Sequence, residues 1–226
     1  MPNTVVLHQW EISPFCGKVR KALKHKGLAF SVVNYNGLLA LRAAKLSPAG
    51  KLPVLEFDGD LIQDSSAIVN FLEARFPGSP LIPSDPAQRA LALVLEDWAD
   101  ESLYWYEVAL RLGDPEVRPK AIELLCQGRP KWERWLVGII AKSRYSKKLA
   151  AQGLGLLPLA QVRAQMMAHV ASIDQMLAAG PWLVGGLKSI ADIAVSAQID
   201  EMVRTSSLAP RILEFSRVRD WLARCA

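Results

Sequence analysis

Residues 4–27 read TVVLHQWEISPFCGKVRKALKHKG, a short β-type run followed closely by a helical one. Residues 4–8 are rich in β-branched and large apolar side chains, which favours a strand. Residues 15–26 predict a helix, because apolar side chains recur there at helical spacing, at Val19, Ala22 and Leu23. Gly27 suits the position just after the end of that helix. The chain therefore opens with a strand, a turn and a helix.

Further short elements follow as far as residue 76. The predicted elements are a strand at 30–33, a short helix at 38–46, a hairpin of strands at 53–57 and 61–63, and a helix at 65–76. The turn Asp58-Gly59-Asp60 supplies the residues that such a hairpin needs. The element order of this part is therefore βαβαββα.

Strand signals almost disappear beyond a proline-rich linker, Ser79 to Pro86. Candidate helices lie at about 87–112, 116–143, 158–179, 189–204 and 210–224. We therefore expect an α/β domain over residues 1–78, a linker over 79–88 and an all-α domain over 89–226.

The composition is that of a folded chain. With 226 residues, 51% hydrophobic and 22% charged, it is too apolar for a disordered protein. Its charge-free runs are shorter than the ~18–20 residues of a membrane span, and its N-terminus lacks the features of a signal peptide. Three widely spaced cysteines fit reduced thiols better than a disulfide scaffold or a zinc site. We expect a cytoplasmic protein without a membrane segment or a metal site.

The formal net charge of +5 is unevenly distributed. Residues 118–148 hold nine basic groups against two acidic ones, whereas residues 84–107 hold one basic group against six acidic ones. A nucleic-acid-binding protein usually carries a recognisable reading module beside its basic stripe, and this chain has none. Nucleic acid is therefore not an expected partner.

The turn Ser13-Pro14-Phe15-Cys16 joins the first strand to the first helix. Serine and proline are ordinary residues at a helix start, so helix entry alone explains them. A helix N-terminus also presents unpaired N–H groups and the positive end of the helix dipole, and a hydroxyl there can stabilise a bound thiolate. Both interpretations stay open on the residues alone.

Two further motifs allow a structural and a functional interpretation. In Lys51-Leu52-Pro53-Val54-Leu55 the proline either begins a strand, where a missing N–H is tolerated, or forms a cis peptide bond that turns the Leu52 backbone toward a peptide-like ligand. In Gln63-Asp64-Ser65-Ser66 the polar residues either cap a helix or hold an amino acid headgroup, with Asp64 on the ammonium and Ser65 on the carboxylate.

Other polar and aromatic residues are expected to serve mainly the fold. Ser189-Ile190-Ala191-Asp192 is a variant capping box in front of an apolar run, and we assign it to folding. Trp98, Trp105 and Tyr106 cannot all face one direction, so one or two of them are candidates to line an apolar pocket. The three histidines have no metal-ligand spacing, and none is named as a base.

Four segments taken together resemble the cytosolic glutathione S-transferase superfamily: Ser13 to Arg20, Lys51 to Leu55, Asp64 to Ile68 and Ser189 to Ala194. Their order and spacing, with an all-α second half, span nearly the whole chain. The resemblance implies an N-terminal thioredoxin-like domain with a glutathione site, a helical C-terminal domain, a hydrophobic co-substrate site between them and a homodimer.

The same resemblance implies roles for single residues. Ser13 falls where serine-type members, including the tau class, place the hydroxyl that stabilises the glutathione thiolate, and Cys16 matches the second cysteine of a glutaredoxin-like motif. The implied glutathione-binding residues are Phe15, Lys51, Leu52, Pro53, Asp64 and Ser65. The sequence departs from tau and omega members at Leu38-Leu39, where those carry a lysine near the glycyl carboxylate.

Three functions follow as hypotheses. The first is a glutathione transferase that joins the glutathione thiolate, stabilised by Ser13, to a small hydrophobic electrophile. The second is a binding protein that keeps the fold without catalysis. The third is a thiol-disulfide or deglutathionylating enzyme that acts through Cys16.

Overall fold

The computed structural model describes residues 4–226, so the first three residues of the predicted N-terminal domain lie outside it. Its N-terminal part is a mixed sheet in which β1 pairs parallel with β2 and antiparallel with β3, and β3 pairs antiparallel with β4. The spatial order is β2-β1-β3-β4. The strands are β1 Val5–Gln9, β2 Ser31–Asn34, β3 Val54–Phe57 and β4 Asp60–Gln63. The predicted order βαβαββα is confirmed.

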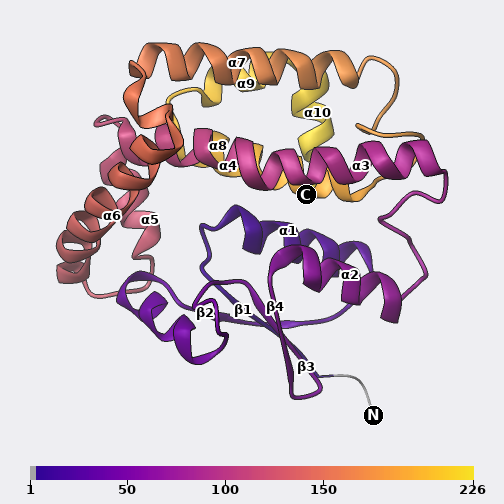
Figure 1. The fold of residues 1–226 in the computed structure, drawn as a ribbon, viewed down its shortest axis with the longest axis horizontal. Helices are drawn as coiled ribbons and strands as arrows, with labels where there is room; N and C mark the ends of the chain where they lie inside the picture. The colour runs from indigo at the N-terminus through magenta and orange to yellow at the C-terminus, as the bar shows by residue number, and fades with distance from the viewer. Residues whose placement is uncertain (1–3) are drawn as a thin grey trace.

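Helices α1, Pro14–His25, and α2, Ser65–Arg75, lie between this sheet and the helical part of the chain (Figure 1). The apolar side of α1 is buried, as its spacing predicts, and Gly27 adopts a φ of 66° just after the helix. The predicted short helix at 38–46 is a 3₁₀ segment, η1, over Gly37–Lys45. This part is thioredoxin-like, with an all-helical region after it.

The helical region starts at Pro86 and contains a long first run. That run is α3 Pro86–Trp98, the π-helical segment η2 Ala99–Leu103, α4 Tyr104–Val108 and a second π-helical segment, η3 Ala109–Gly113. The remaining helices are α5 Arg118–Leu125, α6 Lys131–Gln152, the short 3₁₀ turn η4 Leu154–Leu156, α7 Leu159–Met176, α8 Ile190–Thr205, α9 Ala209–Glu214 and α10 Ser216–Cys225. The domain boundaries at residues 78 and 89 stay a prediction.

Two predicted helices are wrong because each is broken in two. The predicted helix at 116–143 ends at Leu125 and restarts at Lys131, since Gly128 takes a φ of 73° and Pro130 has no N–H to continue a helix. The predicted helix at 210–224 is broken at Phe215, whose backbone is extended with a ψ of 99°.

The break at 126–130 makes α5 and α6 a hairpin that docks on the N-terminal domain. The Glu133 carboxylate accepts a hydrogen bond of 2.9 Å from the Leu38 backbone N–H, and Asn36 donates one of 2.9 Å to the Gln127 carbonyl. Gly37 has a φ of 59° at this contact, and a Cβ atom there would collide with the Glu133 carboxylate. The hairpin thus lies beside η1 at the left of Figure 1.

Helix α8 runs through the centre of the molecule and packs on α1, so the two parts share one continuous core. Its N-terminus carries the predicted capping box. The Asp192 carboxylate is fully buried and accepts hydrogen bonds from the Ser189 N–H (2.8 Å), the Leu183 N–H (2.8 Å) and the Trp221 indole (2.9 Å). Asp192 therefore joins the start of α8 to the preceding loop and to α10, which confirms a role in folding.

Replacing Asp192 by alanine should destabilise the protein strongly. Each buried donor left without an acceptor costs about 1–3 kcal/mol, so Asp192→Ala should lower the free energy of unfolding by about 3 kcal/mol or more. Urea titration followed by circular dichroism measures this. Asp220→Ala, which removes an exposed carboxylate bonded only to its neighbour Arg219, is the control. Equal midpoints for the two variants would contradict the role given to Asp192.

Within residues 4–226, no helix is both long and apolar enough to cross a membrane.

Candidate active site

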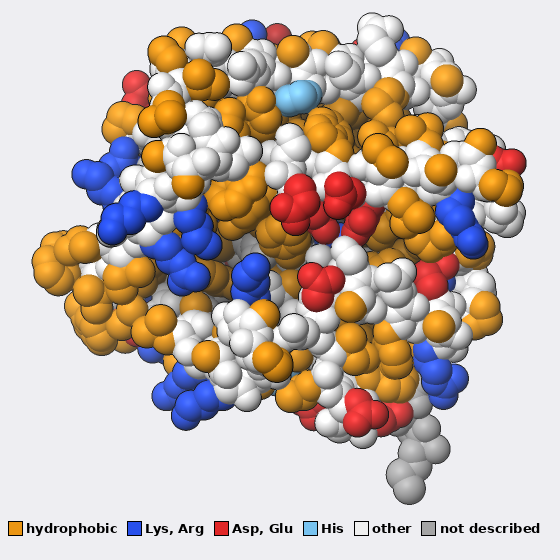
Figure 2. Space-filling model, viewed as in Figure 1, with side chains coloured by type: hydrophobic (Ala, Val, Ile, Leu, Met, Phe, Trp, Pro, Cys, Tyr) orange, Lys and Arg blue, Asp and Glu red, His pale blue; other side chains and the backbone are white. Residues whose placement is uncertain are grey.

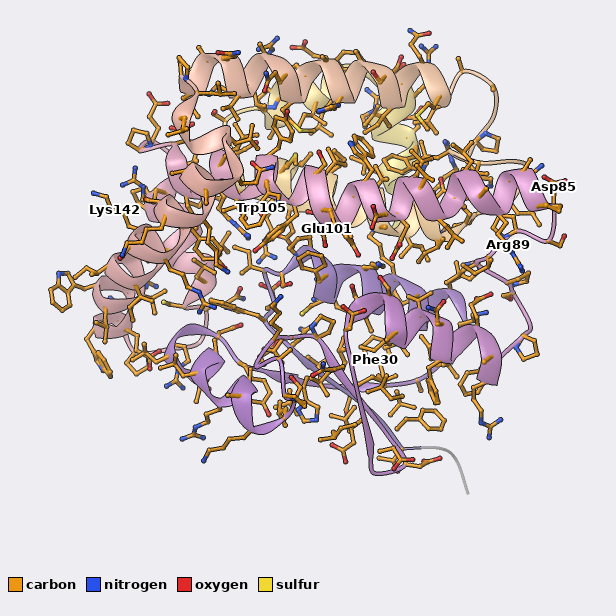
Figure 3. The ribbon with its side chains drawn as sticks, viewed as in Figure 1. Phe30, Asp85, Arg89, Glu101, Trp105 and Lys142 are labelled. Atoms are coloured by element: carbon orange, nitrogen blue, oxygen red, sulfur yellow. The ribbon has the colours of Figure 1, made fainter. Side chains whose placement is uncertain are left out.

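An open pocket of about 270 Å³ lies between the N-terminal domain and the run formed by α3 and η2. All six residues predicted to bind glutathione line it. The full lining is Phe15, Ala49, Lys51, Leu52, Pro53, Gln63, Asp64, Ser65, Ser66, Glu96, Asp97, Asp100 and Glu101. Figure 3 shows Glu101 on the side of its helix that faces the N-terminal domain. The structure thus brings together side chains that are far apart in the sequence.

The predicted cis bond is present between Leu52 and Pro53. Pro53 is buried, and β3 begins at the next residue. Lys51, on the other side of Leu52, is exposed at the pocket. The stretch 51–53 therefore forms one wall of the pocket, with both backbone and side-chain groups.

Asp64 caps α2 and faces the pocket at the same time. Its Oδ1 accepts hydrogen bonds of 3.0 Å from the backbone N–H groups of Ser66 and Ala67, which is the capping geometry. Its backbone has a φ of 76°, and its side chain is exposed. Ser65, the first residue of α2, is buried against the pocket. The two interpretations of this motif, helix cap and headgroup contact, are therefore compatible.

Beneath the pocket lies a buried lysine that the sequence analysis missed. Lys18 of α1 is 1% exposed, and its ammonium pairs with the carboxylates of Glu96 and Asp100, the latter at 2.7 Å. It also donates a hydrogen bond of 3.0 Å to the Ser66 hydroxyl, which in turn donates one of 2.5 Å to Glu96. This network joins α1, α2, α3 and η2 at the pocket wall.

Burial raises the pKa of Asp100 from 3.8 to about 6, and nearby Glu96 adds to this shift while Lys18 opposes it. The folded protein therefore holds a proton on Asp100 in a pH range where the unfolded chain has released it. This carboxyl contributes stability that is complete below about pH 3.8 and is lost as the pH rises to about 6.

Asp100→Asn should remove that pH dependence. Between pH 4 and 6 the free energy of unfolding of the wild type should fall as the pH rises, because its folded state gives up the proton on Asp100. The variant has no such proton, so its free energy of unfolding minus that of the wild type should rise over the same range. Urea titrations at several pH values give the difference. Asp97→Asn removes an exposed carboxylate from the same pocket and should run parallel to the wild type. A constant difference for Asp100→Asn would refute the assignment.

Ser13 is the N-cap of α1, and its Oγ accepts a hydrogen bond of 3.4 Å from the Cys16 backbone N–H. It is half-buried and lies four residues beyond the end of β1, two residues before the pocket residue Phe15, and is itself outside the lining set. The hydroxyl therefore lies at the positive end of the α1 dipole, as its place in the sequence predicts.

Cys16 is fully buried, and that burial raises the pKa of its thiol to about 11, against smaller opposing effects of Ser13 and the Trp10 backbone. A thiol in this state holds almost no thiolate at neutral pH, and its Sγ lies in the core. Because the thiolate is the reactive form, the geometry argues against chemistry at Cys16.

The aromatic residues divide between two surroundings. Trp98 and Tyr106 pack edge-on against His169 of α7, with ring centroids 5.4 and 5.1 Å away. Both residues are half-buried and neither lines the pocket described above, so their place at a co-substrate site stays a prediction. Trp105 is also outside the pocket lining, although its ring lies 5.1 Å from Tyr104, and Tyr104 lies 4.9 Å from Phe15. Tyr104 is thus the aromatic residue that contacts the pocket residue Phe15, and the sequence analysis did not name it as a candidate.

Charges of opposite sign flank the pocket. Figure 2 shows acidic side chains on one side of the central hollow and lysines and arginines on the other. Glu96, Asp97, Asp100 and Glu101 supply the acidic side from the lining itself. On the basic side, the α6 residue Lys148 has its pKa lowered by burial and by the nearby charges of Arg144 and Lys51. The α6 helix therefore brings cations toward Lys51. Segment η1 has Leu38 and Leu39 in its first turn and the basic residues Arg42 and Lys45 in its last turn.

The structure combines a thioredoxin-like sheet part with an all-helical region, and the pocket lies between the two. Residues 7–80 match the family description "Glutathione S-transferase, N-terminal domain". A glutathione S-transferase of Pseudomonas putida is 37% identical over 84 residues, which cover 37% of this chain and 38% of that protein. The chain thus matches about two fifths of the length of this curated relative.

Solved structures extend the similarity to the whole chain at the level of fold. The β-etherase LigF of Sphingobium sp. strain SYK-6 has a TM-score of 0.70 at 23% identity, covering 98% of this chain and 94% of that one. A glutathione transferase homologue from Sulfitobacter, solved with bound glutathione, has a TM-score of 0.64 at 15% identity, covering 99% and 92%. Residues 7–80 therefore match a glutathione S-transferase N-terminal domain, and the whole chain shares its fold with these two solved structures.

Proposed function

We propose that the protein is a glutathione transferase that joins the glutathione thiolate to a small hydrophobic electrophile, with Ser13 stabilising the thiolate. The observation that carries the proposal is the pocket, because the six residues implied by the family motif line it together. We also propose that it acts in the cytoplasm as a homodimer, as the resemblance implies.

In this proposal the γ-glutamyl headgroup binds at the N-terminus of α2. Its carboxylate lies at the N–H and hydroxyl of Ser65, the first residue of the helix, because the next two N–H groups are capped by Asp64. Its ammonium pairs with the exposed Asp64 carboxylate. The Leu52 backbone holds the cysteinyl part as an added strand would. The acidic side of the pocket favours the ammonium, and the basic side near Lys51 favours the glycyl carboxylate.

Ser13 then donates its hydroxyl proton to the thiolate at the start of α1. A thiol of pKa ~8.5 is about 3% ionised at pH 7, and a shift of about two units makes it roughly 75% thiolate. Lower basicity also lowers nucleophilicity, so activation alone gives little rate. Holding thiolate and electrophile in contact supplies the rest.

The electrophile site is proposed beside Phe15 and Tyr104, with Trp105 behind them. The superfamily fold includes the β-etherase LigF, so the fold does not determine which bond the thiolate breaks. The main alternative is a binding protein that uses the same cleft without catalysis. The alternative through Cys16 is disfavoured by the burial of its thiol.

Ser13→Ala should reduce conjugation of a generic aryl halide and leave glutathione binding almost unchanged. The variant loses one hydrogen bond to a charged group, worth about 1.5–3 kcal/mol or roughly 10- to 150-fold in kcat. Steady-state kinetics and calorimetric titration measure the two quantities. Ser13→Thr keeps the hydroxyl and is the matched control. Unchanged kcat in Ser13→Ala would remove the role of Ser13.

Asp64→Asn should weaken glutathione about 10- to 150-fold, because the ammonium then meets a neutral partner. The fold should persist, since asparagine caps a helix about as well as aspartate. Calorimetric titration uses glutathione and an analogue without the γ-glutamyl amine, and Asp60→Asn on the neighbouring strand is the control. Equal affinities for both ligands in all three proteins would exclude the glutathione site and favour the binding-protein alternative.

A further inference from the structure

The loop that carries Ser13 is held mainly from outside its own domain. The Trp10 indole donates a hydrogen bond of 3.1 Å to the Leu125 carbonyl of α5. The Glu11 carboxylate accepts two hydrogen bonds of 2.9 Å, one from each terminal nitrogen of Arg204 in α8. The Ile12 carbonyl accepts a hydrogen bond of 3.1 Å from Arg111 of η3. Three helical segments thus fix three consecutive residues just before Ser13.

The contact of Arg111 is made to Ile12, the residue directly before Ser13. Arg111 is 6% exposed, and its other terminal nitrogen donates a hydrogen bond of 2.8 Å to Glu107, which is 1% exposed. Glu107 lies one helical turn earlier on the same run, so the pair forms a rigid unit within that run. The guanidinium is therefore aimed at the Ile12 carbonyl by a buried partner.

The position of this carbonyl matters for α1. Ile12 O and Ser13 N belong to the same peptide unit, and Ser13 N in turn donates a hydrogen bond of 2.9 Å to the Trp10 carbonyl. A shift of Ile12 rotates that peptide unit and moves the Ser13 side chain relative to the start of α1. Arg111 touches neither the pocket lining nor Asp64, so its influence on a ligand passes through the loop.

We propose that Arg111, oriented by Glu107, is a positioning residue that places the Ser13 hydroxyl on the glutathione thiolate. This inference rests on the proposed function. It assigns part of thiol activation to the helical region, although the thiol itself binds to the N-terminal domain. A displacement of about 1 Å at a reacting centre can cost on the order of 100-fold in rate, so a loosened loop should have a large effect.

The test compares Arg111→Met with a matched control, Arg118→Met. Arg118 also donates a hydrogen bond of 2.8 Å to a backbone carbonyl, that of Leu112, but this bond stays within the helical region. The pKa of the bound glutathione thiol, followed by thiolate absorbance against pH, is the main readout, with kcat and the glutathione Kd beside it. Arg111→Met should raise the thiol pKa by about one unit and lower kcat at least about 10-fold, with Kd within about twofold. Arg118→Met should leave all three unchanged.

Arg111→Met leaves Glu107 buried without its partner and can fail to fold. The double variant Glu107→Gln, Arg111→Met removes both charges together and serves as the second protein. A thiol pKa equal to that of the wild type in a folded variant overturns the proposal, and so does an equal loss in Arg118→Met.

A double-mutant cycle with Ser13→Ala separates positioning from general stability. If Arg111 acts through the hydroxyl, its substitution should have little further effect on kcat once that hydroxyl is absent. Additive losses would overturn the inference and leave the role of Ser13 intact. Failure of the wild type to bind glutathione would instead refute the proposed function, so the two failures are distinguishable.

Discussion

Lys18 carries an ammonium group that is almost completely removed from water, and such burial is tolerated only when counter-charges surround it. Glu96 and Asp100 provide them from the helical region, and Ser66 completes the set from α2. The same carboxylates line the ligand pocket. The pocket wall therefore exists only when α3 and η2 are docked on α1. The ammonium of Lys18 thus links the docking of the two parts to the shape of the pocket.

The site as a whole is assembled by this docking. The N-terminal domain supplies the ends of its own elements: the start of α1, the residues before β3 and the start of α2. The helical region supplies the acidic wall and the anchors of the loop before Ser13. Two of the three loop anchors, Arg111 and Arg204, are charged, and Arg111 is buried together with its partner Glu107. The hydrogen bonds of these anchors are directional, so they hold the loop before Ser13 in one position. Packing of apolar side chains alone would allow several positions of the loop.

The sequence was informative where structure is local. The strand at 4–8, the helix after Ser13 and the cap at Ser189 all rest on neighbours within a few residues. The residues left the cis bond before Pro53 open as one of two alternatives, and the family resemblance favoured it. The residues at 51–53 and 64–65, which the family resemblance implies as glutathione-binding, line one pocket, and their role in binding stays a prediction. Lys18 was missed because a lysine in an amphipathic helix is usually solvated, and its counter-ions lie 78 and 82 residues further along the chain. The packing of Trp98 on α7 likewise depends on a distant contact. The break before Pro130 has local causes in Gly128 and Pro130, which the periodicity of the apolar residues does not show.

The two π-helical segments give the long helical run a property that its length does not reveal. A π turn accommodates one residue more than an α turn, and one residue corresponds to about 100° of rotation around the helix axis. The segments at Ala99–Leu103 and Ala109–Gly113 therefore set the angular phase of everything that follows each of them. Arg111 follows η2 and faces the loop before Ser13 in that phase, while Glu101 within η2 faces the pocket. Deleting one residue from η2 would rotate every side chain after it around the helix axis, while the helix would shorten by only a fraction of a turn. Inserting one residue has the opposite rotation. Such single-residue changes are therefore a simple way for the helix to turn a different set of side chains inward.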